Sequence, residues 1–506
     1  MQNHLRNESH PVYRLGIALL GKGATNHLHR PEVVEALKAK GISVCFLVRE
    51  DYFPLLQRMD GCHYTKLRIE SRKDKVAWIL GYLRYLRSLY PAKDIARRHR
   101  FKVQNRIRKG VCSKFFHALS FFLARYRSVM KLTVFIEGLF HRSIRIEGID
   151  PSELDQLLLL GIGSAGSELE GMLTWWARRN NISVVHAVGN YDHLSSKGFR
   201  GVPVDKLLVW GPSMKEDAVH LQGIPRERVR MIGAVRYSRI DQMIRHDRET
   251  FFRSRGLDPE RRTILFAGSL FEFHYFEMLE TYRQLCKEDD RYQLIIRVYP
   301  NKILMTSPYI RPLLEYAKTL PYVYTSLGDP YFREGEAEDE REVLQIEEEE
   351  LWHCLKYSDV VINLFSTIAL EACIFDKPVI NMWYFPVERR LTILNPVYVD
   401  PSFLIHNRKL ASYGAMRKVS SRKELIATVK EVLKHPGRFV HERRMTVQQE
   451  CGTLDGGAPR RLAEACFEAF TLHKRALREV SEEKCVIYPT GFKQRNREAT
   501  WTSRKF

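Results

Sequence analysis

The amino-acid sequence predicts an α/β protein with two doubly wound domains that face each other across a crevice. Short apolar strands alternate with segments of helical period along most of the 506 residues, which is the pattern of βαβ units and parallel sheets. The charged stretch 235–262 has no strand pattern and separates two such series, so we expect it to be a linker. Ligands of such sheets bind beyond the carboxyl ends of the strands, and the site is therefore expected in the crevice.

The first series predicts a domain that spans residues 1–234. It opens with a strand at 12–20 ("VYRLGIALL"), a glycine-containing turn at 21–26 ("GKGATN"), a helix at 31–40 and a second strand at 43–48. Further strands are expected at 154–161, 182–189, 205–211 and 228–234, with helices at 167–181 and 212–223. The basic segment 71–147 interrupts this alternation and is expected to be an insertion.

The second series predicts a domain at 263–456, followed by a C-terminal helix and basic tail at 457–506. Strands are expected at 263–269, 292–300, 322–326, 359–365 and 378–382, and helices at 275–288, 347–358, 366–375, 421–436 and 458–480. The acidic run 334–350 is interpreted as a solvated loop that leads into a helix, without a catalytic role.

The basic charge of the chain is concentrated in the segment 71–147. The formal net charge is +21, and this segment alone holds 19 Lys and Arg against four Asp and Glu. Apolar and aromatic residues recur among them at helical spacing, as in "FFHALSFFLA" (115–124). Helices with an apolar face and a cationic face lie in the interface of anionic membranes, so we expect this segment to bind a membrane surface. A solvated insertion packed on the sheet remains an alternative, and nucleic acid is not expected because such long apolar patches exceed what a phosphate-tracking groove needs.

The cysteines and the apolar runs bear on the compartment. Nine cysteines occur singly and without a CxxC pair, which favours a reducing environment. The first apolar run is too short and too glycine-bounded for a secretory signal, and no stretch reaches the ~18 apolar residues of a membrane span. The expected location is the cytoplasm, peripheral on the cytosolic face of the membrane.

The stretch "NLFSTIALEACIFDKPVIN" (363–381) carries the clearest candidate for a ligand site. Its first strand delivers Ser366 and Thr367 to a helix N-terminus, where unpaired amides and hydroxyls can bind phosphate oxygens. Glu371 lies one turn deeper on the same face as Thr367, where a carboxylate can accept hydrogen bonds from ribose hydroxyls. Ser366 as a plain helix cap and Glu371 paired with a basic residue is the competing interpretation.

Two stretches resemble the GT-B glycosyltransferase superfamily, "LLVWGPSMKEDAVHLQGIPRERVRMIGAVRY" (207–237) and "SDVVINLFSTIALEACIFDKPVINM" (358–382). The resemblance extends over about residues 150–440 and implies two Rossmann-like domains, with the helix at Ser366 contacting nucleotide-sugar phosphates and Glu371 holding the ribose. Many retaining members have a further Glu where this sequence has Asn363. The Ser-Thr pair is more similar to surface-polysaccharide transferases, CDP-glycerol glycerophosphotransferases and UDP-N-acetylglucosamine 2-epimerases.

Other candidate residues follow strand ends on both sides of the crevice. In the second domain, strand-end positions suited to a donor phosphate are Gly268, Ser269 and Arg297. In the first domain, an acceptor-side loop would use Gly21, Lys22, Thr25 and Asn26. The candidates for a catalytic base are His186, His27 and Asp192.

The expected activity is a glycosyltransferase reaction from a nucleotide-diphosphate sugar to a lipid-linked or surface-glycan acceptor. Electrostatic stabilisation of the departing diphosphate would need no metal and no cofactor, since the nucleotide sugar is a substrate. A CDP-glycerol-type glycerophosphotransferase or a nucleotide-sugar 2-epimerase of the same fold is the alternative. A protein that binds membrane or nucleic acid without catalysis is a further one.

Overall fold

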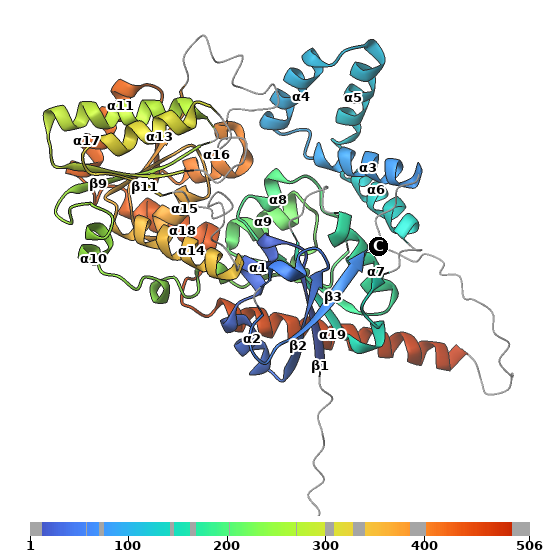
Figure 1. The fold of residues 1–506 in the computed structure, drawn as a ribbon. Helices are drawn as coiled ribbons and strands as arrows, with labels where there is room; N and C mark the ends of the chain where they lie inside the picture. The colour runs from blue at the N-terminus through green and yellow to red at the C-terminus, as the bar shows by residue number, and fades with distance from the viewer. Residues whose placement is uncertain are drawn as a thin grey trace, which may run out of the picture.

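Two parallel sheets organise the chain, as the sequence predicts (Figure 1). The computed structural model describes residues 13–56, 58–69, 75–141, 146–161, 168–201, 203–269, 271–298, 308–326, 340–384 and 401–487. The first sheet has eight strands in the order β4-β3-β2-β1-β5-β6-β7-β8, and the second has six in the order β11-β10-β9-β12-β13-β14. Every pairing is parallel except that of β3 with β4. The strand orders are those of doubly wound sheets.

The first body is built on the first sheet and covers it with helices on both faces. Its strands are β1 (Tyr13–Leu19), β2 (Ile42–Arg49), β3 (His63–Ile69), β4 (Ile146–Glu147), β5 (Gln156–Gly161), β6 (Ser183–Val188), β7 (Lys206–Val209) and β8 (Val229–Met231). Its helices are α1 (Lys22–Leu28), α2 (Pro31–Lys38), α7 (Glu168–Arg179), α8 (His193–Ser196) and α9 (Pro212–His220). Alternate residues of β6 show the two faces, because Val184 and Val188 join one core and Val185 joins the other.

The basic insertion forms four helices between β3 and β4. They are α3 (Lys75–Ser88), α4 (Ile95–Ile107), α5 (Val111–Leu123) and α6 (Arg127–Phe140). A separate small core with Leu86, Tyr90, Phe121 and Met130 holds them together. Among the residues that the structure describes, no helix is both long enough and apolar enough to cross a membrane.

The second body repeats the doubly wound arrangement. Its strands are β9 (Arg262–Ala267), β10 (Tyr292–Arg297), β11 (Val323–Ser326), β12 (Val360–Asn363), β13 (Val379–Met382) and β14 (Met416–Val419). Its helices are α10 (Arg248–Arg253), α11 (Glu272–Glu288), α13 (Ile310–Thr319), α14 (Glu340–Tyr357), α15 (Ile368–Ile374), α16 (Ile405–Ser412) and α17 (Arg422–Lys434). In Figure 1, α11, α13 and α17 cover one face of the sheet, and α14 and α15 lie on the other.

The two bodies are joined by more than the linker. Trp210, Tyr237 and Trp352 form a continuous series of edge-to-face ring contacts at 5.6 and 5.8 Å between centroids, and one apolar core extends through them into both bodies. After α18 (Val440–Cys451), the long helix α19 (Ala458–Ile487) returns to the first body and packs on α2, β6 and β7.

Two sequence-based expectations are corrected by the structure. The segment 21–26 is not a turn, because α1 starts at Lys22, where Gly21 precedes it in an extended conformation. Ala24 and Leu28 are buried four residues apart, so packing on the sheet favours the helix over the flexibility of its glycines.

The acidic run 334–350 is likewise not a solvated loop where it is described. From Glu340 onward it belongs to α14, and Glu348 is buried. Residues 334–339 lie outside the described residues, as does 488–506 of the expected basic tail. Strands β3 and β14 were not expected, since each is short or half-exposed and shows no long apolar run.

Candidate functional site

The two bodies meet at the carboxyl ends of β6 and β12. Asn190 follows β6, and its Nδ2 donates to Oγ1 of Thr367, just before α15, at 3.2 Å. One residue further, the hydroxyl of Tyr191 donates to Oδ1 of Asn407 in α16 at 3.4 Å. The two bodies are therefore in direct polar contact at the edge where the sequence predicts a crevice, and Thr367 takes part in this contact.

The turn from β12 into α15 is shaped by Asn363. Its Oδ1 accepts a hydrogen bond from the backbone N–H of Ser366 at 3.0 Å, and Asn381 accepts one from the N–H of Phe365 at 3.2 Å. Phe365 has φ of 51°, in the left-handed region that a non-glycine residue rarely adopts. Asn363 is therefore part of the turn that positions Ser366 and Thr367.

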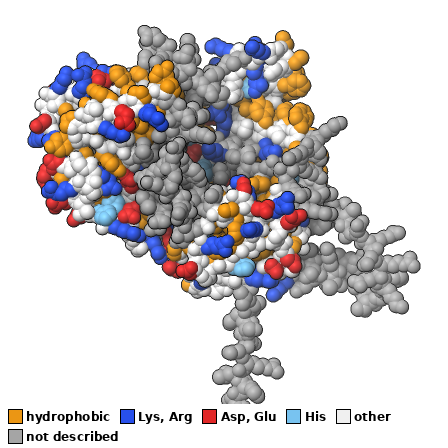
Figure 2. All heavy atoms as spheres, viewed as in Figure 1, with side chains coloured by type: hydrophobic (Ala, Val, Ile, Leu, Met, Phe, Trp, Pro, Cys, Tyr) orange, Lys and Arg blue, Asp and Glu red, His pale blue; other side chains and the backbone are white. Residues whose placement is uncertain are grey.

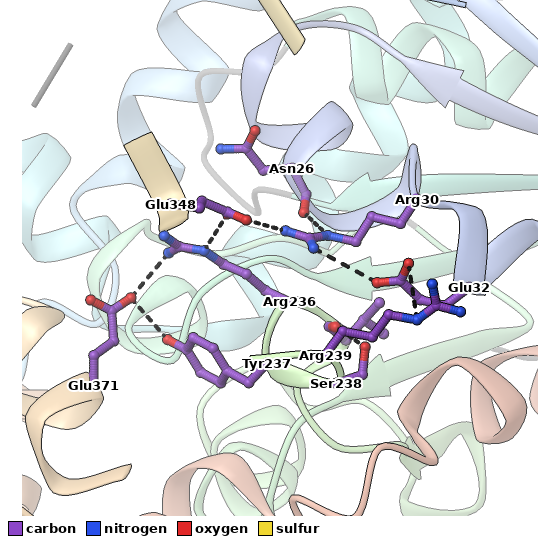
Figure 3. A network of polar contacts seen from close by, with 10 residues as sticks. Asn26, Arg30, Glu32, Arg236, Tyr237, Ser238, Arg239, Glu348 and Glu371 are labelled. Atoms are coloured by element: carbon purple, nitrogen blue, oxygen red, sulfur yellow. Dashed lines mark hydrogen bonds and ion pairs between the residues drawn. The ribbon is translucent and has the colours of Figure 1, made fainter. Parts of the chain in front are cut away.

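Glu371 is buried and bound to the linker (Figure 3). Its Oε1 accepts from Nη1 of Arg236 at 3.1 Å and from the Tyr237 hydroxyl at 3.2 Å. Burial alone would lower the pKa of Arg236, but the carboxylates of Glu371 and Glu348 raise it above its ordinary value. Burial, reinforced by Glu371, raises the pKa of Tyr237 well above its ordinary value. The competing interpretation of Glu371, pairing with a basic residue, is realised in this structure, and its ribose role stays a prediction.

Glu348 connects this network to the first body. Its Oε1 accepts from Nε of Arg236 at 2.9 Å, and its Oε2 accepts from Nη2 of Arg30 at 2.7 Å. Burial would raise the pKa of the Glu348 carboxyl, but the two guanidinium groups hold it below its ordinary value. Arg30 lies between α1 and α2, so an ion pair with both side chains at most 13% exposed joins the two bodies.

A cavity of about 270 Å³ lies beside this ion pair. It is lined by residues of α1, α2, the linker and α14, namely Thr25, Asn26, His29, Arg30, Pro31, Glu32, Arg239, Gln242, Met243, Arg245 and Glu348. Thr25 and Asn26 of the predicted acceptor-side segment therefore face a cavity. The hydroxyl of Thr25 is already bonded to that of Tyr52 at 3.0 Å, and Gly21 caps α1 with its backbone. Lys22 begins α1, and its side chain is outside the described residues.

The other predicted donor-side residues lie at the ends of β9 and β10. A Cβ on Gly268 would stand 2.0 Å from the Tyr275 hydroxyl, so glycine is needed there for packing. The Ser269 hydroxyl accepts from the N–H of Phe271 at 3.0 Å. Arg297 is buried and donates to the hydroxyl of Ser326 at 3.2 Å. These contacts fix the strand ends that would face a donor.

His186 lies inside the first body, facing α7. Its Nε2 is 3.0 Å from the Thr174 hydroxyl, and its Nδ1 is 3.1 Å from Nη2 of Arg200. Since a guanidinium only donates, Nδ1 is an acceptor and Nε2 carries the proton. Burial, together with the charge of Arg200, holds the pKa of His186 well below its ordinary value. The ring is thus neutral and held on both nitrogens.

Asp192 belongs to a cluster of titratable groups where the two bodies meet. Burial would raise the pKa of its carboxyl, but His193 and His406 hold it below the ordinary value. Burial lowers the pKa of His193 to about 4 and that of His406 to about 4, each against the opposing charge of Asp192. Among the described residues, Asp192 Oδ1 and His193 Nδ1 are buried atoms without a hydrogen-bond partner. An ionised carboxylate beside neutral imidazoles is an arrangement that can accept a proton.

His27 completes this group from the side of α1. The ring is half-buried and lies 6.0 Å from that of Trp210. Burial lowers the pKa of His27 well below its ordinary value, and the charges of Arg236, Arg30 and His193 act in the same direction. His27 and Asp192 thus share His193 as an electrostatic neighbour, while the contacts of His186 described above lie within the first body.

Several residues of the candidate site were not predicted from the sequence. They are Asn190, His193, Arg236, Tyr237, Glu348 and His406. His193 ends the stretch "VVHAVGNYDH" (184–193), and Arg236 and Tyr237 end "GAVRY" (233–237), so their places next to strand ends were the available signal. Glu348 and His406 gave no local signal, because their partners are more than a hundred residues away.

Comparison with known proteins finds solved structures that match most of this chain at low sequence identity. No protein-family model and no curated protein matches the chain. A UDP-N-acetylglucosamine 2-epimerase structure is 13% identical with a TM-score of 0.48, covering 90% of this chain and 94% of that one. The wall teichoic acid polymerase TagF is 10% identical with a TM-score of 0.45, covering 91% and 90%.

A glycosyltransferase from Rickettsia africae is 10% identical with a TM-score of 0.44, covering 91% of this chain and 99% of that one. The GT-B-like fold assignment rests on the strand orders of this chain's two sheets and on the return of α19 to the first body.

Proposed function

We infer that the chain is a GT-B-type glycosyltransferase that moves a sugar from a nucleoside-diphosphate donor to a hydroxyl group of an acceptor. The observation that carries this proposal is the meeting of Asn190, Asp192 and His193 of the first body with Thr367 and His406 of the second. Substrates bind between the two bodies of such folds, and here the crevice holds a charged proton acceptor beside hydrogen-bonding groups.

In this proposal the second body holds the donor. Thr367 and Ser366 would contact the diphosphate, with Arg297 and the strand end at Gly268 and Ser269 behind it. The guanidinium groups of Arg30 and Arg236, which lie close enough to His27 to lower its pKa, would stabilise the negative charge of the leaving diphosphate.

The first body would activate the acceptor. Asp192 is ionised at neutral pH and His193 is neutral, so this pair can take the proton of the attacking hydroxyl. We propose Asp192 with His193 as the base, in preference to His186, whose two ring nitrogens are already bonded inside the first body. The acceptor would be lipid-linked or a surface glycan.

Nucleotide binding is the first experiment. We expect one of UDP, GDP, CMP and CDP to raise the melting temperature clearly, because a ligand at a hundredfold excess over its Kd adds about 2.7 kcal/mol of stability. Absence of a shift with every nucleotide at millimolar concentration would remove the donor site and leave a non-catalytic protein.

Turnover then tests the base. Release of nucleoside diphosphate from a nucleotide sugar with membrane extract as acceptor should fall about 10²–10⁴-fold in Asp192→Asn or His193→Gln. His220→Gln is the matched control, because His220 is an exposed histidine on α9. Unchanged turnover in Asp192→Asn, together with a loss in His186→Gln, would return the assignment to His186.

A nucleotide-sugar 2-epimerase is the second candidate. The clustering of Asp192, His193 and His406 from both bodies favours it, because epimerisation needs one group to take the proton of the sugar C2 as the diphosphate leaves C1. A second group then returns a proton to the opposite face of C2 as the diphosphate adds back to C1. An epimerase would turn over without an acceptor and would incorporate deuterium at the sugar C2 in heavy water, whereas a transferase would do neither. CDP-glycerol in the same turnover assay tests glycerophosphotransfer.

A further inference from the structure

The helical insertion keeps its polar and aromatic pairs on the inner face of α5. The hydroxyl of Tyr85 lies 2.6 Å from Nδ1 of His117, and that of Tyr82 lies 3.0 Å from the Ser120 hydroxyl. Phe101 of α4 stacks on Phe121 with 4.3 Å between ring centroids. One face of α5 is thus fully used for packing on α3 and α4.

The opposite face of α5 is apolar and exposed. Val111, Phe115, Phe116 and Phe122 are 84%, 63%, 60% and 49% exposed, and Leu119 continues the same stripe at helical spacing. Side chains of this size are otherwise the first to be buried, so the stripe costs stability unless a partner covers it.

A second exposed stripe follows on α6. It consists of Leu132, Phe135 and Leu139, spaced by three and four residues. The ring of Tyr126, between the two helices, contacts that of Phe122 edge to face at 5.5 Å. Eleven of the twenty exposed large hydrophobic side chains in the described residues lie between Trp78 and Leu139. Figure 2 shows hydrophobic side chains grouped over this insertion, with basic side chains beside them.

The same helices carry unbalanced positive charge. From Ile95 to Ile136 the sequence has eleven Lys and Arg and no Asp or Glu. Lys109 and Lys114 are exposed next to the α5 stripe, and Arg125, Arg127 and Lys131 are exposed between it and the α6 stripe. Cations at the edge of an apolar face complement a surface that is apolar inside and anionic outside.

We propose that the exposed faces of α5 and α6 form a docking surface for an anionic phospholipid bilayer, with the Phe and Leu stripes inserted at the level of the headgroups. A second copy of the chain fits less well, because pairing these faces would bring two strongly basic surfaces together. Nucleic acid would use the cations but leave the stripes exposed. The surface deepens the proposed function, since it would bring a lipid-linked acceptor to the first body.

Vesicle flotation of the full chain tests the proposal, without nucleotide, so that failure here is separate from failure of the donor site. Vesicles of phosphatidylcholine with one third phosphatidylglycerol should carry the protein upward, and pure phosphatidylcholine should carry far less of it. The triple variant Phe115→Ser, Phe116→Ser, Phe122→Ser should lower the bound fraction at least about tenfold, because its apolar anchor is removed.

Two further double variants test the electrostatic contribution to vesicle binding and its restriction to this surface. Lys109→Glu with Lys114→Glu should weaken binding to the anionic vesicles and reduce its sensitivity to salt. The matched control is Phe276→Ser with Tyr309→Ser, which removes exposed aromatic side chains from the second body and should float like the wild type. All of these positions are exposed, so the melting temperatures should stay close to that of the wild type.

Four results would overturn the proposal. One is a wild-type protein that stays at the bottom of the gradient with anionic vesicles. Another is flotation that persists in the triple Phe variant. The third is a lipid-free dimer, seen by light scattering, that the triple variant converts to a monomer without any vesicle binding in the wild type, which would assign the face to a second copy. Flotation abolished by added single-stranded oligonucleotide but unaffected by the Phe changes would assign it to nucleic acid.

Discussion

Arg236 of the linker donates to Glu371 of α15 across 3.1 Å, and this contact ties the connection between the two bodies to the helix expected to hold the donor. The same guanidinium is bonded to Glu348 of α14. The linker therefore does not merely connect the bodies but contributes a charged side chain to the interior of the site. Movement of the linker and the position of Glu371 are coupled by this bond.

Replacing Glu371 should test its buried pairing with Arg236 and Tyr237 separately from its predicted ribose contact. In Glu371→Ala the Tyr237 hydroxyl loses its acceptor and Arg236 loses one of two carboxylates, so we expect a loss of about 1–3 kcal/mol in the free energy of unfolding. Glu371→Gln keeps an acceptor oxygen and should lose less, as measured by urea denaturation. If Glu371 also holds the ribose, both variants weaken the nucleotide found in the melting screen. Equal stability of the Ala and Gln variants would speak against the buried pairing.

The ion pair between Arg30 and Glu348 should be energetically coupled. A double-mutant cycle with Arg30→Met and Glu348→Gln should give a coupling energy of roughly 0.5–3 kcal/mol, since both side chains are largely buried. The exposed pair of Arg253 and Glu249 is a matched control and should give about 0.3–0.5 kcal/mol. A coupling as small as in the control would mean that the two bodies are not held together at this point.

The stability that Glu348 contributes to the folded protein should decrease on acidification. Its pKa is lower in the folded protein than in the unfolded chain, so its contribution is present above the unfolded value of about 4.3 and is lost as the pH falls through the folded value. The difference in melting temperature between wild type and Glu348→Gln should therefore be largest at neutral pH and shrink below about pH 4. A difference that grows on acidification would contradict this pairing.

His406 should act in the same direction but at a higher pH. Its pKa falls to about 4 on folding, chiefly through burial, so the unfolded chain binds a proton that the folded protein refuses. Stability should decline as the pH is lowered from about 6.5 toward 4, on the order of 1–2 kcal/mol between pH 7 and pH 5 from this residue. His406→Gln should flatten that part of the pH profile of the melting temperature. A profile as steep as the wild type would place its cause in the other buried histidines.

Asn363 should matter through the backbone of the turn. In Asn363→Ala the N–H of Ser366 loses its acceptor, and we expect a loss of about 1–3 kcal/mol in the free energy of unfolding. Nucleotide affinity should change as well, because the same turn positions Thr367. Asn363→Asp retains the acceptor oxygen and serves as the comparison. A neutral Asn363→Ala variant would indicate that the turn is maintained by Asn381 and Phe365 alone.

The fold was predictable because its information is local. Apolar strands of five or six residues, followed by segments of helical period, identified nearly every strand of both sheets, and the positive charge of 71–147 identified the insertion. Strands with half-exposed patterns, such as β3, were missed because their stability comes from pairing with β2 and not from an apolar run.

The site was predictable only in part, because ion pairs between distant residues leave no local pattern. Thr367 and Asp192 follow strand ends, where sheet geometry alone indicates a ligand site, and His27 lies in α1, the helix that follows β1. His186 also stands near the end of β6, but its side chain points to the face of the sheet that α7 covers. The alternation of side chains along a strand shows which residues share a face, but it does not show which helix covers that face. Glu348 was assigned to solvent since nothing in "EEEE" (347–350) shows that one of four carboxylates meets two arginines.

The return of α19 has a consequence for the order of assembly during synthesis. The first body is interrupted by the entire second body, and Leu462, Ala463 and Cys466 of α19 belong to its core. The sheet of the first body thus emerges from the ribosome more than two hundred residues before the helix that covers one of its faces. A nascent chain arrested before Ala458 should expose that apolar face to chaperones, whereas the second body is complete by then and can fold first.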